Sequence, residues 1–215
     1  MTNCKEMNWH STRLDRVMNI RVYGKPTAAP ILVFPTQDAM SDNFENFGMI
    51  KALAEDLNSG RIQLFCVDTV DTETWSNVWG DKTWRAHRQE QYYAYIIDEV
   101  VPCIYRENTS GRLPIAAGCS LGGLHAAIVF FRRPDLFGGV LALSGVYDAK
   151  FFTDGWMNDV LYDNSPLDFL VNMPCDHPYI DLYNQRRIVL CVGQGRWEDE
   201  GRRTTALMGD VLYSK

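Results

Sequence analysis

The stretch LPIAAGCSLGGLHAAIVFF, residues 113–131, decides the fold of this chain. A short apolar run, Leu113–Ala117, leads into the pattern G-x-S-x-G, and an apolar helical stretch, Leu121–Arg132, follows it. This order is typical of a nucleophile elbow, in which serine occupies a sharp turn and glycines let strand and helix approach closely. We predict Ser120 as the nucleophile. The N–H of Leu121, at the positive end of the helix, is predicted to be an oxyanion donor.

Similar apolar runs recur along the chain, at Ile31–Phe34, Ile62–Val67, Val140–Leu143 and Ile188–Val192. Short continuous runs of this kind indicate strands that are covered on both faces. Amphipathic helical patterns lie between them at Trp84–Tyr105, where Pro102 should kink or end the helix, and at Glu198–Leu212. The alternation predicts an α/β protein with a mainly parallel sheet and helices on both faces.

The composition limits the function. The 215 residues include 21 Lys and Arg against 27 Asp and Glu, a net charge of −6, and 46% are hydrophobic. This balance excludes a disordered chain and argues against binding to duplex nucleic acid. No apolar run reaches the roughly 18–20 residues of a membrane span, and no apolar signal core follows Met1, so we expect a cytoplasmic protein without membrane contact.

The six cysteines are scattered without C-x-x-C spacing, which argues against a disulfide framework or a zinc site. We expect mostly free, buried thiols in a reducing compartment. Phosphate-loop, dinucleotide-binding and H-E-x-x-H motifs are missing, so no cofactor and no metal is expected.

Residues 1–215 are expected to form a single domain. Residues 150–184 break the strand–helix rhythm and are rich in Asp, Asn, Pro and aromatic residues. We interpret them as an irregular insertion or cap over the sheet edge, because they are too long for an ordinary connection. Whether this segment contacts substrate or is only a packed surface excursion stays open.

A second oxyanion donor is normally supplied by the loop after an earlier strand. Here that loop is Phe34–Asp38, and Thr36 or Gln37 can provide the N–H. Pro35 has none. The alternative is an ordinary polar loop.

The acid of a catalytic triad should follow a strand later than the serine. The run Ile188–Val192 leads into a loop that ends in Glu198, Asp199 and Glu200. We favour Glu198, then Asp199, with Glu200 last. Acids are also common at helix N-termini as caps and dipole partners, and at most one of these can be catalytic. Asp148, after the run that ends near Ser144, is a further candidate.

The order of the histidines does not fit the pattern of a catalytic triad. All four histidines, His10, His87, His125 and His177, precede Glu198, whereas the template places the histidine last. His125 follows Ser120 by five residues on the same helix, so it should point away from it. His177, within residues 150–184, is the one plausible base. We expect the usual histidine to lie beyond Lys215, on a missing strand and helix of roughly 25–30 residues.

The chain resembles the α/β-hydrolase superfamily and, within it, the esterase family that includes esterase D, feruloyl esterases and mycolyltransferases. The resemblance covers most of the chain and rests on the elbow and on the segments Val33–Thr36, Phe47–Ile50, Val67–Trp75 and Val192–Asp199. It implies a nucleophile at Ser120, an acid at Glu198 or Asp199, an oxyanion loop at Thr36 or Gln37, and a histidine segment with no counterpart here.

We therefore expect a serine-dependent carboxylic ester hydrolase that forms an acyl-enzyme on a small-molecule ester. An acyltransferase using the same site is an alternative that the sequence does not separate from it. A catalytically impaired binding protein on a hydrolase fold is another, supported by the missing histidine. Cys119 is also a nucleophilic side chain, but its neighbour Ser120 fits the elbow better. Homo-oligomerisation stays open.

Overall fold

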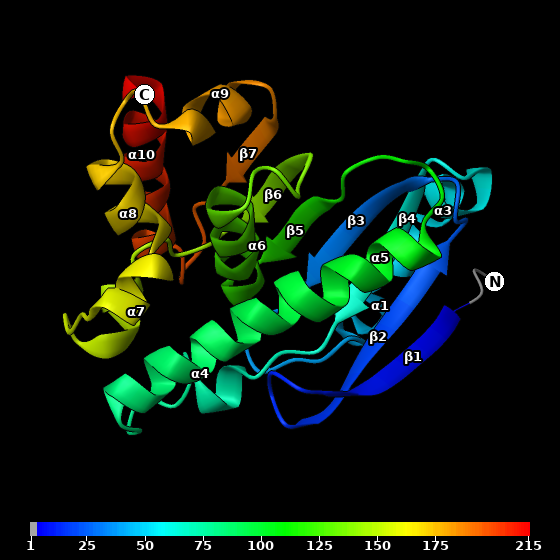
Figure 1. The fold of residues 1–215 in the computed structure, drawn as a ribbon, viewed down its shortest axis with the longest axis horizontal. Helices are drawn as coiled ribbons and strands as arrows, with labels where there is room; N and C mark the ends of the chain where they lie inside the picture. Colours follow the sequence, from blue (N-terminus) through cyan, green and yellow to red (C-terminus); the bar gives the residue numbers. More distant parts are fainter. Residues whose placement is uncertain (1–3) are drawn as a thin grey trace.

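The computed structural model describes residues 4–215, which form a seven-stranded sheet in the order β1-β2-β4-β3-β5-β6-β7 (Figure 1). The strands are β1 (Cys4–Ser11), β2 (Arg16–Gly24), β3 (Ala29–Phe34), β4 (Ile62–Val67), β5 (Ile115–Cys119), β6 (Gly139–Leu143) and β7 (Arg187–Cys191). The five from β4 to β7 in this order are parallel, whereas β1 and β2 pair antiparallel. The predicted mainly parallel sheet is confirmed.

The strand order reverses direction at the centre of the sheet. From β3 the chain moves to β4 on one side and later to β5 on the other, so β3 and β5 are neighbours. Phe34 at the end of β3 pairs with Gly118 near the end of β5, which brings the two carboxyl ends level. Such a reversal leaves a crevice between the connections that follow the two strands, and ligands of open α/β sheets bind there.

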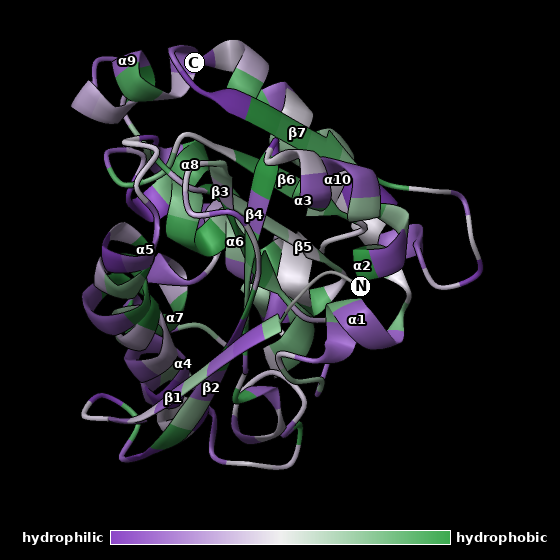
Figure 2. Ribbon diagram, turned by 90° about the vertical axis from the view of Figure 1, so that its right-hand side faces the viewer, coloured by the Kyte–Doolittle hydropathy of each residue, from purple (hydrophilic) through white to green (hydrophobic). Residues whose placement is uncertain are grey.

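Helices lie on both faces of the sheet, as predicted. The expectation that every parallel strand is covered on both faces is wrong for β6 and β7, where Leu141, Leu143 and Val189 are exposed because none of the described helices packs on that side of these strands. On one face lie α1 (Asn43–Asn46), α2 (Met49–Ala52) and α3 (Ala54–Ser59), whose Ile50 and Leu57 pack on Leu64 and Cys66 of β4. The opposite face carries the larger core and is covered by α4 (Lys82–Tyr95), η2 (Ile96–Val100), α5 (Val101–Glu107), α6 (Leu121–Arg132), α8 (Pro166–Asn172) and α10 (Asp199–Ser214). Figure 2 shows α6 green over most of its length, whereas β1 at the sheet edge is largely purple.

The sequence reading missed β1 and β2. These strands form the antiparallel edge, and β2 alternates exposed and buried positions, with Met18, Ile20 and Val22 facing the core. A half-covered strand has a period of two in its hydrophobicity, and a search for continuous apolar runs does not detect it. β5 was found but begins at Ile115, after Pro114, which has no N–H to donate to a ladder.

Of the two outcomes predicted for Pro102, an end of the helix is wrong, whereas a local departure from regular α-helix is present. Helical structure continues from Lys82 to Glu107, and Figure 1 shows it crossing the front of the sheet. A π turn, Ile96–Val100, comes directly before Pro102, which then lies in the first turn of α5. The π turn interrupts the regular i→i−4 hydrogen bonding just before Pro102, and a proline, which has no N–H to donate, is accommodated at such an interruption.

Residues 150–184 contain short helices rather than only irregular chain. They include most of η3 (Ala149–Thr153), followed by α7 (Asp159–Asp163), α8 and α9 (Pro178–Asn184). The division into one domain with a cap remains a prediction. No helix among residues 4–215 is long and apolar enough to cross a bilayer.

The cysteine prediction is correct in part. All six thiols are free, but only Cys66 and Cys103 are buried. The other four are exposed: Cys119 and Cys191 are the last residues of β5 and β7, Cys4 is the first residue of the edge strand β1, and Cys175 lies between α8 and α9.

An ion pair between α4 and α6 provides a test of the packing. Arg132 donates to both carboxylate oxygens of Glu90 at 2.7 and 2.8 Å, and the amide of Asn164 donates to the same carboxylate at 2.7 Å. Burial alone would raise the pKa of Glu90, but these hydrogen bonds and the Arg132 charge outweigh it, and the pKa is lowered.

A lowered pKa in the folded state means that the pair stabilises the protein at neutral pH. This stabilisation is lost as the pH falls below about 4.3, the ordinary pKa of a glutamate, and through the lower pKa of Glu90 in the folded state. We expect Glu90→Gln to be less stable than wild type in urea unfolding at pH 7, and the difference to shrink steadily toward pH 3. A difference that is constant with pH would contradict this account.

Candidate active site

Ser120 occupies the turn between β5 and α6 in a strained conformation. Its φ is 58° and its ψ is −124°, a region that L-residues adopt at a cost of about 1–3 kcal/mol. The N–H of Ser120 donates to the carbonyl of Leu143 at the end of β6, at 2.8 Å. The turn is thus anchored to the neighbouring strand, and the serine side chain is exposed at the carboxyl edge of the sheet.

Two glycines make this turn possible. A Cβ on Gly118 would lie 2.3 Å from the carbonyl of Gly122, and a Cβ on Gly122 would lie 2.5 Å from the carbonyl oxygens of Phe34 and Pro35. Real Cβ atoms do not approach backbone this closely. The two glycines therefore let the first turn of α6 rest directly on the ends of β3 and β5, as the sequence predicted.

A cavity of about 320 Å³ opens beside Ser120. Its lining comes from five parts of the chain and consists of Gln37, Ser120, Leu121, Ser144, Val146, Phe151, Phe152, Trp197, Glu200 and Gly201. Four candidate residues from the sequence thus line one cavity: Ser120, Leu121, Gln37 and the least favoured acid, Glu200. Phe151 and Trp197 are 56% and 86% exposed, so the mouth of the cavity presents aromatic surface to solvent.

The two candidates for the second oxyanion donor differ in their hydrogen bonds. The N–H of Thr36 already donates to the side-chain oxygen of Asn43 at 3.1 Å. For the N–H groups of Gln37 and Leu121, residues 4–215 supply no acceptor. The side chain of Gln37 is held by Ser76, whose Oγ accepts from Nε2 at 3.0 Å. The geometry favours Gln37 over Thr36.

The carboxylate of Glu198 is held in place by the loop that precedes α10. It accepts hydrogen bonds from the N–H of Gly193 at 3.0 Å and of Gly195 at 2.7 Å, and the hydroxyl of Ser144 donates a short bond to it. The bond from Ser144, together with the two backbone bonds, lowers the pKa of Glu198. Its side chain makes no capping bond to α10, so it is not the helix cap that its position allowed.

The other three acids are engaged elsewhere. Asp199 is exposed and faces Arg202 at 3.5 Å. Glu200 lines the cavity but is paired with Arg203, and Asp148 caps η3 and lies 3.4 Å from the same arginine. Of the four acids, only Glu198 accepts a hydrogen bond from Ser144, the residue that follows β6. The last residue of β6, Leu143, accepts the N–H of Ser120.

Ser144 is a site residue that the sequence reasoning missed. It follows β6 as Ser120 follows β5, its φ is 51°, and its N–H donates to Cys191 at the end of β7 at 2.7 Å. It touches the cavity and Glu198 together. The sequence could have indicated Ser144, because it directly follows the apolar run of β6, just as Ser120 directly follows the run of β5.

The structure brings none of the four histidines into this cavity. His125 points away as predicted, because its Nε2 lies 2.8 Å from Asp71 Oδ1 and its ring stacks on Phe34 in the core. His177, predicted as the plausible base, instead accepts the N–H of Tyr179 at the start of α9. His10 faces Asp15 from β1, and His87 is exposed on α4. The lining formed by residues 4–215 holds no histidine.

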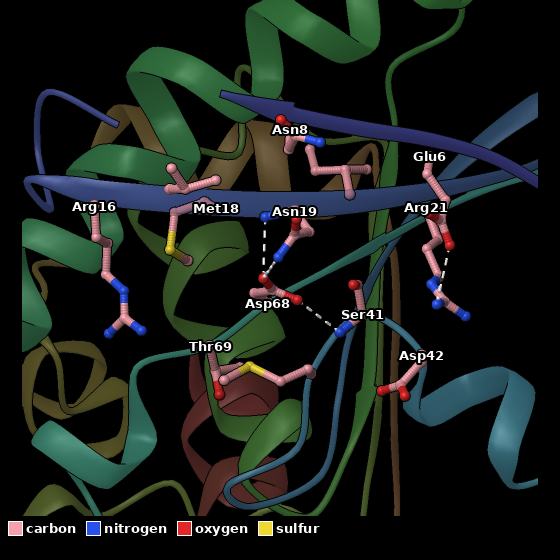
Figure 3. Close-up of a pocket in the computed structure, with 13 residues that line it drawn as sticks. Glu6, Asn8, Arg16, Met18, Asn19, Arg21, Ser41, Asp42, Asp68 and Thr69 are labelled. Atoms are coloured by element: carbon pink, nitrogen blue, oxygen red, sulfur yellow. Dashed lines mark hydrogen bonds and ion pairs between the residues drawn. The ribbon is translucent and has the colours of Figure 1, made fainter. Parts of the chain in front are cut away.

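A separate cavity of about 440 Å³ lies over β2 and the loop after β4 (Figure 3). The buried carboxylate of Asp68 accepts the N–H and the side-chain amide of Asn19 and the N–H of Ser41. On the rim, Arg21 is paired with Glu6. Arg16, also in the lining, pairs with Glu73 outside it, and the cavity holds none of the predicted site residues.

The chain superposes on solved structures of esterases. A ferulic acid esterase superposes with a TM-score of 0.71 at 14% identity, over 98% of this chain and 87% of its own. The S-formylglutathione hydrolase of Staphylococcus aureus gives 0.60 at 16%, over 99% and 96%. The enterobactin esterase of Shigella flexneri gives 0.65 at 22%, over 99% of this chain but only 50% of its own.

The fold is thus of the α/β-hydrolase type. The family model described as "Putative esterase" matches residues 11–209, and the chain belongs to this esterase family. No curated protein matches it by sequence. The family and the structural neighbours together support carboxylic ester hydrolase activity.

The contact between Gly122 and β3 yields a stability prediction. Gly122→Ala forces a Cβ against two backbone oxygens, so we expect a loss of about 1–3 kcal/mol or more in the free energy of unfolding. Gly209→Ala is the matched control, because that helical glycine in α10 has no atom within 4 Å of the added Cβ. The control should gain about 0.5–1 kcal/mol from helix propensity. Urea unfolding measures both, and equal stabilities of the two variants would contradict the close contact.

Proposed function

We propose that the protein is a serine-dependent carboxylic ester hydrolase in which Ser120 attacks the ester carbonyl and forms an acyl-enzyme. The observation that carries this proposal is the strained Ser120 turn, open to a 320 Å³ cavity beside two N–H groups without acceptors. As the carbonyl becomes tetrahedral, its oxygen gains negative charge, which the N–H groups of Leu121 and Gln37 would stabilise. Collapse of this intermediate expels the alcohol, and water then releases the acid.

Glu198 is proposed as the acid of the site. Its three hydrogen bonds hold the carboxylate ionised and fixed next to the ends of β5 and β6, where a charged base would need an orienting partner. Ser144 is proposed to position this carboxylate, since its hydroxyl donates to Glu198 from the strand that anchors Ser120.

Removal of the Ser120 proton requires a base, and the cavity lining within residues 4–215 offers no histidine. We therefore expect slow turnover by these residues alone, since oxyanion stabilisation and binding retain part of the rate when a triad member is missing. The same observation favours a second candidate function, the binding of small esters without hydrolysis.

Labelling by a fluorophosphonate probe separates the two candidates. Wild type should form a covalent adduct, and Ser120→Ala should reduce labelling at least 100-fold, to background, because the attacking oxygen is gone (a loss of the order seen for triad members). Cys119→Ser is the matched control: it removes the adjacent thiol and should keep wild-type labelling. Adduct formation is measured by intact mass against time.

Equal labelling of wild type and Ser120→Ala would exclude Ser120 as the nucleophile. If wild type is never labelled but binds short acyl esters in calorimetry, the binding function replaces the hydrolase.

A further inference from the structure

Arg85 on α4 is buried without a carboxylate partner. Its side chain is 3% exposed, and its hydrogen bonds go to three backbone carbonyls: Nε donates to Thr74 at 2.7 Å, and Nη2 donates to Trp75 at 3.2 Å and to Phe152 at 2.8 Å. Nη1 is buried and has no acceptor among the described residues. Burial lowers the pKa of this guanidinium, because nothing nearby fully compensates its charge.

Burying a charge without a charged partner lowers the stability of the fold. An apolar side chain of similar length would fill the space without this penalty. What only the planar guanidinium offers is several donors in a fixed plane. Here they join two segments that are far apart in sequence, the loop after η1 (Asp71–Glu73) and η3. The rings of Trp75 and Phe152 also pack together, with centroids 5.3 Å apart.

One of the joined segments lines the cavity beside Ser120, and the other hydrogen-bonds to a lining residue. Phe152 is one of its lining residues. In the other segment, Ser76 follows Trp75 directly and holds the side chain of Gln37, a second lining residue. Arg85 does not line the cavity itself, yet the positions of Phe152 and Gln37 both depend on the segment that it holds.

We propose that Arg85 is a positioning residue that sets the shape of the ester-binding cavity by locking residues 74–76 against Phe152. The inference rests on the proposed hydrolase function of the same cavity. Without the guanidinium, the carbonyls of Thr74 and Phe152 lose their donors and the two segments separate. The wall at Phe152 then moves, and the Gln37 N–H loses its fixed direction.

Arg85→Met keeps most of the side-chain length and removes every donor. Arg85→Lys keeps the charge, but its compact ammonium cannot span three carbonyls. Arg88→Met is the matched control on the next turn of α4, because the Arg88 guanidinium donates to Glu73, Gln91 and Leu14 and makes no hydrogen bond to Trp75 or Phe152. Ser76→Ala is a mild fourth variant that releases only Gln37.

The kinetic readout is the hydrolysis of p-nitrophenyl acetate, butyrate and hexanoate. In both Arg85 variants we expect KM for the longer esters to rise and the KM ratio between hexanoate and acetate to change at least 5-fold. The total loss in kcat/KM should reach up to about 100-fold, the size typical of a misplaced reacting group. Ser76→Ala should lower kcat with little change in KM, and Arg88→Met should keep the wild-type KM ratio.

Hydrogen exchange provides a readout that needs no activity. Amides of residues 74–78 and 150–155 should exchange at least 10-fold faster in the Arg85 variants and at wild-type rates in Arg88→Met. If wild type hydrolyses no ester, the proposed function fails while exchange still tests the Arg85 contact. Wild-type exchange together with wild-type KM ratios in Arg85→Lys would overturn the proposal, even if Arg85→Met fails to fold.

Discussion

At Gly118 and Gly122 the backbone of β5 and the backbone of α6 meet with no side chain between them. This contact fixes where α6 begins, and it leaves Ser120 the only residue that bridges strand and helix. The same contact brings the first turn of α6 against the carbonyls of Phe34 and Pro35, so the loop after β3 lies next to the serine. The cavity and the free N–H groups exist because these three backbone segments touch.

The strain of the Ser120 turn is supported by the core around it. Nearly all of α6 is buried, including Leu124, Phe130 and Phe131, and burial of apolar side chains contributes about 1.5–3 kcal/mol each. A conformational cost of about 1–3 kcal/mol is small beside this. The bond from Ser120 N–H to Leu143 then removes the alternative of a relaxed turn, because it fixes the peptide to β6.

The sequence predicted the positions of the parallel strands well, because all of them are continuous apolar runs, which are typical of strands covered on both faces. It did not predict that one face of β6 and β7 is open. It predicted β1 and β2 poorly, since they are half exposed, and it did not foresee that a π turn lets the helix pass through Pro102. At the site, local spacing was enough for Ser120 and Leu121. The sequence did not distinguish Thr36 from Gln37 as oxyanion donors, because the difference lies in a hydrogen bond to Asn43. It did not single out Ser144 or Arg85 as site residues.

By itself, the sequence determined the strand–turn–helix around Ser120, since its glycines, its serine and its apolar flanks act within one continuous segment. Only the tertiary structure decided what surrounds that serine. Glu198 rather than Asp199 reaches the end of β6, and His125 and His177 are bound in the core and at a helix start. These outcomes follow from strand order and register, which join residues far apart in the chain and leave no local periodicity to read.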